Sequence, residues 1–195
     1  MNRSFFLILG TLFVAATPAL AHTGVGSVSG FSAGFGHPIG GLDHVLAMVA
    51  VGILAAQLGG KSAWLVPASF VTMMVIGGIL GINGVHVPFV ELGIVGSVII
   101  LGAVIALGRE LPMGLAMALV GLFAIFHGHA HGTEMPMDAS GLEYAFGFII
   151  ATTILHAAGI GLSFGVQHLA NKIAPLAVRI SGGAITACGL ALLLL

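Results

Sequence analysis

Two short polar clusters interrupt this apolar chain, and each combines histidine with a carboxylate. Residues 37–44 read HPIGGLDH, and residues 126–134 read FHGHAHGTE. Imidazole nitrogens and carboxylate oxygens together form a ligand set suited to divalent first-row transition metals. Burying polar and charged side chains within an apolar segment costs free energy, so such side chains usually pair with one another or bind a ligand. We therefore predict that the two clusters hold a divalent transition-metal ion.

The spacing of the second cluster places its candidate ligands on one face of a helix. If the helix continues through residues 126–134, His127 and His131 lie one turn apart, and Glu134 follows on the same stripe. His129 then points in another direction. Neutral imidazoles would supply nitrogen ligands, and the carboxylate would offset the positive charge of the ion.

The first cluster contains residues that bend a helix. Pro38 and the Gly-Gly pair that follows it predict a bent or re-entrant start of the span rather than a regular helix. Such a bend brings His37 back toward Asp43 and His44. Asp43 is then expected to offset the positive charge of the ion where it passes from water into a region of lower dielectric constant.

The predicted metal ligands come from both clusters: His37, Asp43, His44, His127, His131 and Glu134. Three further histidines are additional candidates: His22, His129 and His156. His156 lies in the middle of an apolar run and is expected to face the interior of the bundle. Each of His86, His156 and His168 also has an ordinary interpretation as a structural or solvated histidine.

The composition indicates a membrane protein. Of 195 residues, 58% are hydrophobic and only 6% are charged, whereas a soluble domain carries about 25% charged residues. So few charges exclude an ordinary soluble enzyme and a disordered chain. Five Lys and Arg against six Asp and Glu leave no basic patch for nucleic acid. The single cysteine, Cys188, excludes an internal disulfide framework and a cysteine-rich metal site.

Residues 1–21 have the pattern of a cleaved signal peptide. Arg3 supplies the positive start, residues 5–16 form a short apolar run, and residues 19–21 provide the A-x-A cleavage pattern. The alternative is an uncleaved first membrane helix. Cleavage would leave His22 first, outside the cytoplasm, where its α-amine and imidazole together would chelate an ion. We expect a signal peptide over residues 1–21 and a six-helix transmembrane domain over residues 22–195.

Six apolar runs after residue 21 are long enough to cross about 30 Å of hydrocarbon. They cover residues 40–58, 63–82, 87–107, 111–126, 142–164 and 176–195. The connections between them are short, so consecutive helices are expected to be antiparallel neighbours. The predicted fold is an all-α membrane protein, a compact bundle of six transmembrane helices after the signal peptide.

Basic residues orient this bundle. With an outer start, Lys61, Arg109 and Lys172 fall in the three cytoplasmic loops, and Arg179 lies near the same side. This distribution agrees with the positive-inside rule. The same orientation places both histidine clusters at the outer ends of their spans, and it places both ends of the mature chain outside.

The two motifs resemble those of a known family of transporters. The patterns H-x5-D-H at residues 37–44 and FHGxAHGxE at residues 126–134 closely resemble the two signatures of the HupE/UreJ family of nickel and cobalt permeases. The resemblance extends over the whole chain, through the signal peptide and the six spans. The residues alone indicate only a divalent transition metal.

The resemblance implies a secondary permease of the bacterial inner membrane. Its role would be uptake of Ni²⁺ or Co²⁺ for metalloenzymes such as hydrogenase, urease or cobalamin-dependent enzymes. The expected partners are the metal ion and the lipid bilayer, with no nucleic acid and no permanently bound cofactor. The sequence has no P-loop pattern, so the chain is not expected to hydrolyse ATP by itself.

Two other functions would use the same histidines. An intramembrane metal-dependent enzyme is one, but the sequence lacks His-Glu-x-x-His and a serine or cysteine nucleophile motif. A copper- or zinc-handling protein is the other, because Met135 and Met137 beside the second cluster are soft ligands that suit Cu(I). We expect a permease rather than an enzyme.

Overall fold

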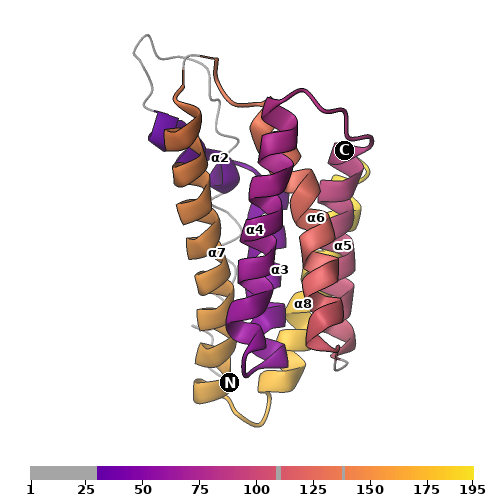
Figure 1. The fold of residues 1–195 in the computed structure, drawn as a ribbon. Coiled ribbons are helices and arrows are strands. Elements are labelled where there is room, and N and C mark those ends of the chain that lie inside the picture. Colours follow the sequence, from indigo (N-terminus) through magenta and orange to yellow (C-terminus); the bar gives the residue numbers. More distant parts are fainter. Residues whose placement is uncertain (1–29, 109–110, 138) are drawn as a thin grey trace.

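A computed structural model describes residues 30–108, 111–137 and 139–195. The regular structure of these residues is helical throughout, which confirms the predicted all-α class (Figure 1). The helices are α2 (Gly30–Gly40), α3 (Leu42–Leu58), α4 (Ser62–Ile82), α5 (Val90–Leu107), α6 (Met113–Thr133), α7 (Gly141–Leu169) and α8 (Ala174–Leu192). The predicted signal peptide and His22 lie outside the described residues.

Long apolar helices make this chain a multi-span membrane protein. In the described part of the chain, the five helices α4 to α8 are each long and apolar enough to cross a membrane. Helices α2 and α3 meet the same criterion only when taken together, and the chain turns by 81° between them. The bent start predicted for the first span is therefore confirmed.

The turn between α2 and α3 occurs at Gly41, whose backbone is extended (φ −99°, ψ 121°). A Cβ atom at this position would lie 2.7 Å from Asp43 Oδ1 and 3.1 Å from His44 Nδ1. Glycine thus allows the backbone to approach both polar side chains closely. As a result, the end of α2 and the first turn of α3 lie against one another.

Two helices extend beyond the apolar runs that predicted them. Helix α6 reaches Thr133 instead of ending at residue 126, and α7 reaches Leu169 instead of ending at residue 164. The added turns of α6 contain His127 and His131, which are fully buried. A boundary drawn from hydropathy stops at the first polar residues. The helix itself continues, because neighbouring helices bury those residues.

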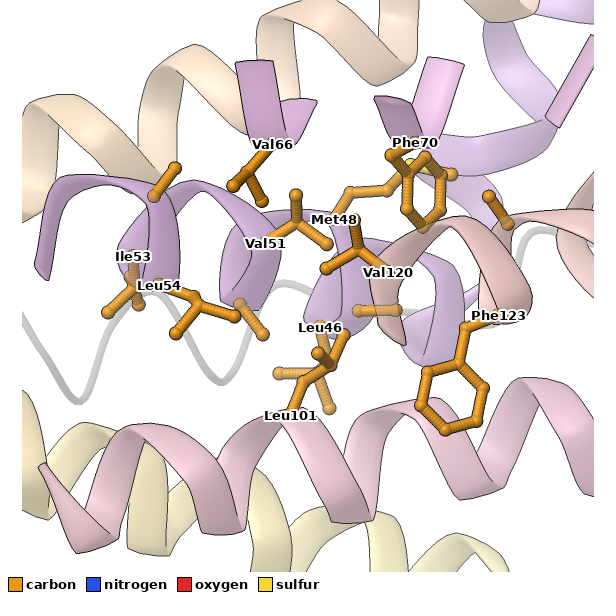
Figure 2. Close-up of a cluster of buried hydrophobic side chains, with 14 of the residues drawn as sticks. Leu46, Met48, Val51, Ile53, Leu54, Val66, Phe70, Leu101, Val120 and Phe123 are labelled. Carbon is orange, nitrogen blue, oxygen red and sulfur yellow. The ribbon is translucent and has the colours of Figure 1, made fainter. Parts of the chain in front are cut away.

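Helix α3 forms the centre of the bundle. Most of its residues are buried, and it packs against α4, α5 and α7. Figure 2 shows Leu46 and Met48 of this helix among apolar side chains of its neighbours, including Leu101 of α5 and Phe123 of α6. A helix that is hydrophobic all round is expected in such a buried position. Because His44 lies on the first turn of α3, this core also holds His44 in place.

Glycines bring α4 and α6 into close backbone contact. A Cβ atom on Gly128 would overlap the carbonyl oxygen of Met74, and one on Gly132 would overlap the carbonyl oxygen of Gly78. In a membrane, small residues allow this approach, and apolar side chains gain little by leaving lipid. This glycine seam sets the height and rotation of α6, and therefore the positions of its buried histidines.

The two ends of the bundle differ in their polar residues. The loop between α3 and α4 contains Lys61, and the loop between α7 and α8 contains Lys172. Both loops lie at one end of the bundle, drawn at the bottom of Figure 1. Near that end, Arg179 Nε donates a hydrogen bond to the carbonyl oxygen of Ala106 (2.9 Å). Helix α2, the loop between α6 and α7, and the carboxyl terminus lie at the opposite end. Both histidine motifs therefore share one end of the bundle, while Arg109 falls outside the described residues.

Candidate metal centre

Histidines from three helices converge at the end of the bundle that carries α2. His37 lies on α2, His44 on the first turn of α3, and His131 near the end of α6. Each offers one ring nitrogen, and these three atoms lie within 4.8 Å of one another. The ring centroid of His131 is 4.7 Å from that of His37 and 5.0 Å from that of His44. The structure therefore joins the two sequence motifs at one place.

His127 adds a fourth imidazole, one turn deeper along α6. Its ring centroid is 4.8 Å from that of His44, and its side chain is fully buried. The helical continuation through the second motif thus brings His127 and His131 to the same face of α6, as their spacing predicted. We refer to His37, His44, His127 and His131 as the histidine cluster.

Asp43 holds the imidazole of His44. Its Oδ1 lies 2.8 Å from His44 Nδ1 and accepts a hydrogen bond from the backbone N–H of His44 at 2.7 Å. A carboxylate at Nδ1 favours the tautomer with its proton on Nδ1, which leaves a lone pair on Nε2. His44 Nε2 is buried and has no hydrogen-bond partner among the described residues. Asp43 therefore orients an imidazole whose second nitrogen remains free for a cation.

Glu134 makes a comparable contact with His37. It lies directly after the last residue of α6, and its Oε2 is 3.1 Å from His37 Nε2. Both side chains are partly exposed, whereas His127 and His131 are fully buried. His37 and Glu134 therefore lie at the exposed edge of the site, and the deeper imidazoles are enclosed by the bundle.

Ser97 on α5 fixes the tautomer of His127. Its hydroxyl donates to the carbonyl oxygen of Ile94 at 2.6 Å, so its oxygen is available to accept a hydrogen bond from His127 Nε2 at 3.0 Å. With the proton on Nε2, Nδ1 of His127 keeps its lone pair. That Nδ1 is buried and has no partner in the described structure. Ser97 thus acts on His127 as Asp43 acts on His44.

His131 differs from the other members of the histidine cluster. Neither of its ring nitrogens has a hydrogen-bond partner in the part of the chain that the structure describes. Its ring stacks on Phe148 of α7, with 5.1 Å between centroids and 6° between planes. A buried polar group without a partner costs about 1–3 kcal/mol. Together with the free nitrogens of His44 and His127, these atoms concentrate lone pairs that a divalent cation would satisfy.

The sequence as a whole matches one family of proteins. The family described as HupE / UreJ protein matches residues 10–192. A relative named Protein HupE, from Rhizobium leguminosarum bv. viciae, is 45% identical over 190 residues, which cover 95% of this chain and 96% of the relative. The chain belongs to the HupE/UreJ family. No solved structure matches it.

Membership in the HupE/UreJ family confirms the resemblance carried by the two motifs. It supports the general role of a metal permease over that of an enzyme. All four imidazoles of the histidine cluster come from these two motifs. Ser97 of α5 adds a hydrogen-bond partner for His127.

Two other predicted candidates of this HupE/UreJ protein lie outside the histidine cluster. His129 Nε2 is 2.8 Å from the carbonyl oxygen of Val85, in the segment between α4 and α5. Its side chain therefore points elsewhere, as its place on the helix predicted. His156 is buried near the middle of α7, and its ring lies 5.1 Å from that of Phe70. It is separate from the four clustered imidazoles, and it faces the bundle interior as expected.

The methionines of this HupE/UreJ protein do not strengthen the copper alternative. Met137 is wholly exposed, and Met135 packs against the hydrophobic core and approaches Gly141. His86 and His168 are exposed, in agreement with their interpretation as solvated histidines. In the described residues, the grouping of metal-binding side chains is therefore found where the two motifs meet.

Ser97 is the contributor that sequence reasoning missed in this HupE/UreJ protein. It lies in the apolar run of α5, 30 residues before His127. Serine in a membrane helix commonly bonds to its own backbone, as Ser97 also does through Ile94. A single hydroxyl in such a run therefore carries no specific signal, and only the packing of α5 against α6 reveals its partner.

Proposed function

We propose that this protein is a secondary permease that takes up Ni²⁺, with Co²⁺ as the close alternative, across the bacterial inner membrane. The ion would supply metalloenzymes such as hydrogenase or urease. The observation that carries the proposal is the convergence of His37, His44 and His131, whose ring nitrogens lie within 4.8 Å of one another. Such a nitrogen-rich site suits a first-row transition metal, whereas Ca²⁺ and Mg²⁺ take oxygen ligands. The metal is the transported ion rather than a resident cofactor.

The proposed capture site consists of the six motif residues His37, Asp43, His44, His127, His131 and Glu134. An incoming ion meets Glu134 first, because its side chain is more exposed than those of His37 and Asp43. The three buried imidazoles then replace the water ligands of the ion as it enters the bundle. Asp43 and Glu134 offset its positive charge as it leaves water.

The capture site faces the periplasm in the proposed orientation, with both ends of the mature chain on that side. The positive-inside rule supports this orientation, because Lys61 and Lys172 lie at the opposite end of the bundle. Cysteine labelling with an impermeant reagent, in a Cys188→Ala background, tests it. Gly84→Cys should react from outside the cell and Lys61→Cys should not. The reverse pattern would place the histidine cluster at the cytoplasmic face and contradict capture from outside.

Uptake of metals into cells tests the transport function. Cells that express the protein should accumulate Ni²⁺ above cells that do not, and Co²⁺ should compete more strongly than Zn²⁺ or copper ions. His168→Ala is a matched control, because His168 is an exposed histidine of α7. Equal accumulation in both kinds of cell, with the protein present in the membrane, would contradict the permease. Preferential uptake of copper or zinc would instead favour the copper- or zinc-handling alternative.

A further inference from the structure

A further buried imidazole lies deeper in the bundle than the histidine cluster. His156 on α7 is 2% exposed, and neither of its ring nitrogens has a hydrogen-bond partner among the described residues. The ring of Phe70 meets it edge-on, with 5.1 Å between centroids. The same Phe70 ring lies 5.6 Å from that of His127. One aromatic side chain therefore contacts both His156 and the deepest imidazole of the cluster.

His156 occupies the middle of its span. It is the sixteenth of the 29 residues of α7, and it follows Phe148, which stacks on His131, by eight positions. At about 1.5 Å of rise per residue, His156 lies roughly 12 Å deeper along α7 than Phe148. An imidazole with two unsatisfied nitrogens is costly as a packing residue at this depth. Ionisable side chains inside a membrane commonly mark the path of an ion or a proton.

Two further unpaired polar groups lie on α7 and α3, two helices that pack against one another. The two helices touch where a Cβ atom on Gly52 would overlap the carbonyl oxygen of His156. Further along these helices, α7 carries Ser163 about two turns after His156, and α3 carries Gln57 about one and a half turns after Gly52. Ser163 Oγ and Gln57 Oε1 are both buried without a hydrogen-bond partner in the described structure. Free polar groups thus continue from His156 toward the end of the bundle opposite the histidine cluster.

We propose that His156 is an inner metal-binding station, which receives the ion from the histidine cluster and passes it toward Ser163 and Gln57. The proposal rests on the permease function proposed above and adds a route to it. A single imidazole binds a divalent metal more weakly than four imidazoles with two carboxylates. A weaker second station allows the ion to leave the capture site and still be released at the far end.

Substitutions of His156 distinguish a metal ligand from a packing residue. The variants are His156→Leu, His156→Ala and His156→Cys, all in a Cys188→Ala background, with His168→Ala as the control on the same helix. Leucine fills the space but offers no ligand, whereas cysteine restores a ligand of different softness. Initial Ni²⁺ uptake is measured at equal membrane abundance, and equilibrium Ni²⁺ binding is measured on the purified full chain.

We expect the leucine and alanine variants to lower the maximal uptake rate by about tenfold or more, which corresponds to about 1.4 kcal/mol in the barrier to transfer. Their Ni²⁺ binding should remain close to that of the parent, because the histidine cluster is intact. His156→Cys should transport faster than His156→Ala and should become more sensitive to inhibition by Zn²⁺, which thiolates favour. His168→Ala should transport as the parent does.

Three results would overturn the inner station. The first is unchanged uptake by His156→Leu. The second is equal uptake and equal Zn²⁺ sensitivity in the alanine and cysteine variants, because a packing role does not distinguish a ligand. The third is loss of Ni²⁺ binding together with uptake in correctly folded His156→Leu, which would place His156 in the capture site. Failure of the parent itself to bind and transport metal would reject the permease function, and the inner station with it.

Discussion

The histidine cluster and His156 hold imidazoles in the same bundle under different constraints. In the cluster, three of the four imidazoles have an oxygen atom that holds one ring nitrogen. These pairs are His44 with Asp43, His37 with Glu134 and His127 with Ser97. His156 has no such oxygen among the described residues, and its ring instead packs against Phe70.

The difference shows how one kind of side chain serves two tasks. An oxygen partner fixes the ring orientation and the tautomer before the ion arrives, which lowers the cost of ordering the ligand on binding. His131 lacks such a partner but stacks on Phe148 beside His37 and His44, which have one, whereas no oxygen-held imidazole is in ring contact with His156 among the described residues. A group of oriented imidazoles suits capture from dilute solution, and a single unheld imidazole suits brief contact during transfer. The following variants test this contrast, from the largest expected effect to the smallest.

The largest loss of Ni²⁺ binding is expected from His131→Ala. His131 belongs to the group of three histidines whose ring nitrogens lie within 4.8 Å, and both of its nitrogens are otherwise unpaired. Ni²⁺ binding should weaken by about 100-fold or more, because even groups that only support metal ligands change affinity about 10–100-fold. Titration of the purified protein with Ni²⁺ measures this change. Parent-like affinity would remove His131 from the site and break the comparison with His156.

The next largest effect is expected from Asp43→Asn, which keeps the size of Asp43 but removes its charge. Binding should weaken by about 10–100-fold, because His44 loses the carboxylate that orients it. Combined with His131→Ala, the loss should be far from additive, because one ion contacts both motifs. The readout is the concentration dependence of initial uptake together with binding to purified protein. Additive losses, with substantial binding left in each single variant, would indicate two independent patches.

A smaller effect is expected from Ser97→Ala, which removes the acceptor for His127 Nε2 but no predicted ligand. Ni²⁺ affinity should fall by about tenfold, which is the lower end of the loss expected when a group that supports a metal ligand is removed. Ser97→Thr keeps the hydroxyl and should restore most of the affinity. Thermal unfolding of the metal-free variants serves as the control for packing. Equal affinities in the alanine and threonine variants would show that the hydroxyl does not position His127.

The smallest effect in this series is expected from His129→Asn. His129 bonds to the carbonyl oxygen of Val85 and lies outside the histidine cluster. An amide keeps a donor at this position, so uptake should change by less than about twofold, as for substitutions away from critical contacts. Uptake at limiting Ni²⁺ is the measurement. A loss comparable to that of His131→Ala would show that His129 takes part in capture and would enlarge the site beyond the four clustered imidazoles.

Much of the candidate site was predictable because its first level of organisation is local. Helical periodicity alone places His127 and His131 on one face, and it turns His129 away from them. Pro38 and the glycines after it likewise predicted the bend that returns His37 toward His44. The ring centroids of these two histidines lie 6.0 Å apart. These features depend on residues that are close in the chain, so spacing was sufficient to find them.

The limits of α6 were less predictable. Hydropathy ended its apolar run at residue 126, whereas the helix continues to Thr133. Polar residues normally mark the end of a span, but here neighbouring helices bury the histidines, because Ser97 of α5 contacts His127 and Phe148 of α7 stacks on His131. The helix end therefore depends on a neighbouring helix and not on the residues of α6 alone.

By itself, the sequence determined that this chain forms a bundle of apolar helices and that two of its motifs carry histidine and carboxylate ligands. Those properties follow from hydropathy and helical period, which are local. Only the tertiary structure decided that His37 meets Glu134, that Ser97 meets His127, and that His156 stands apart behind Phe70. These contacts depend on the 81° turn between α2 and α3 and on how the helices pack against one another. The spacing of residues along one helix carries no information about which face of another helix those residues will contact.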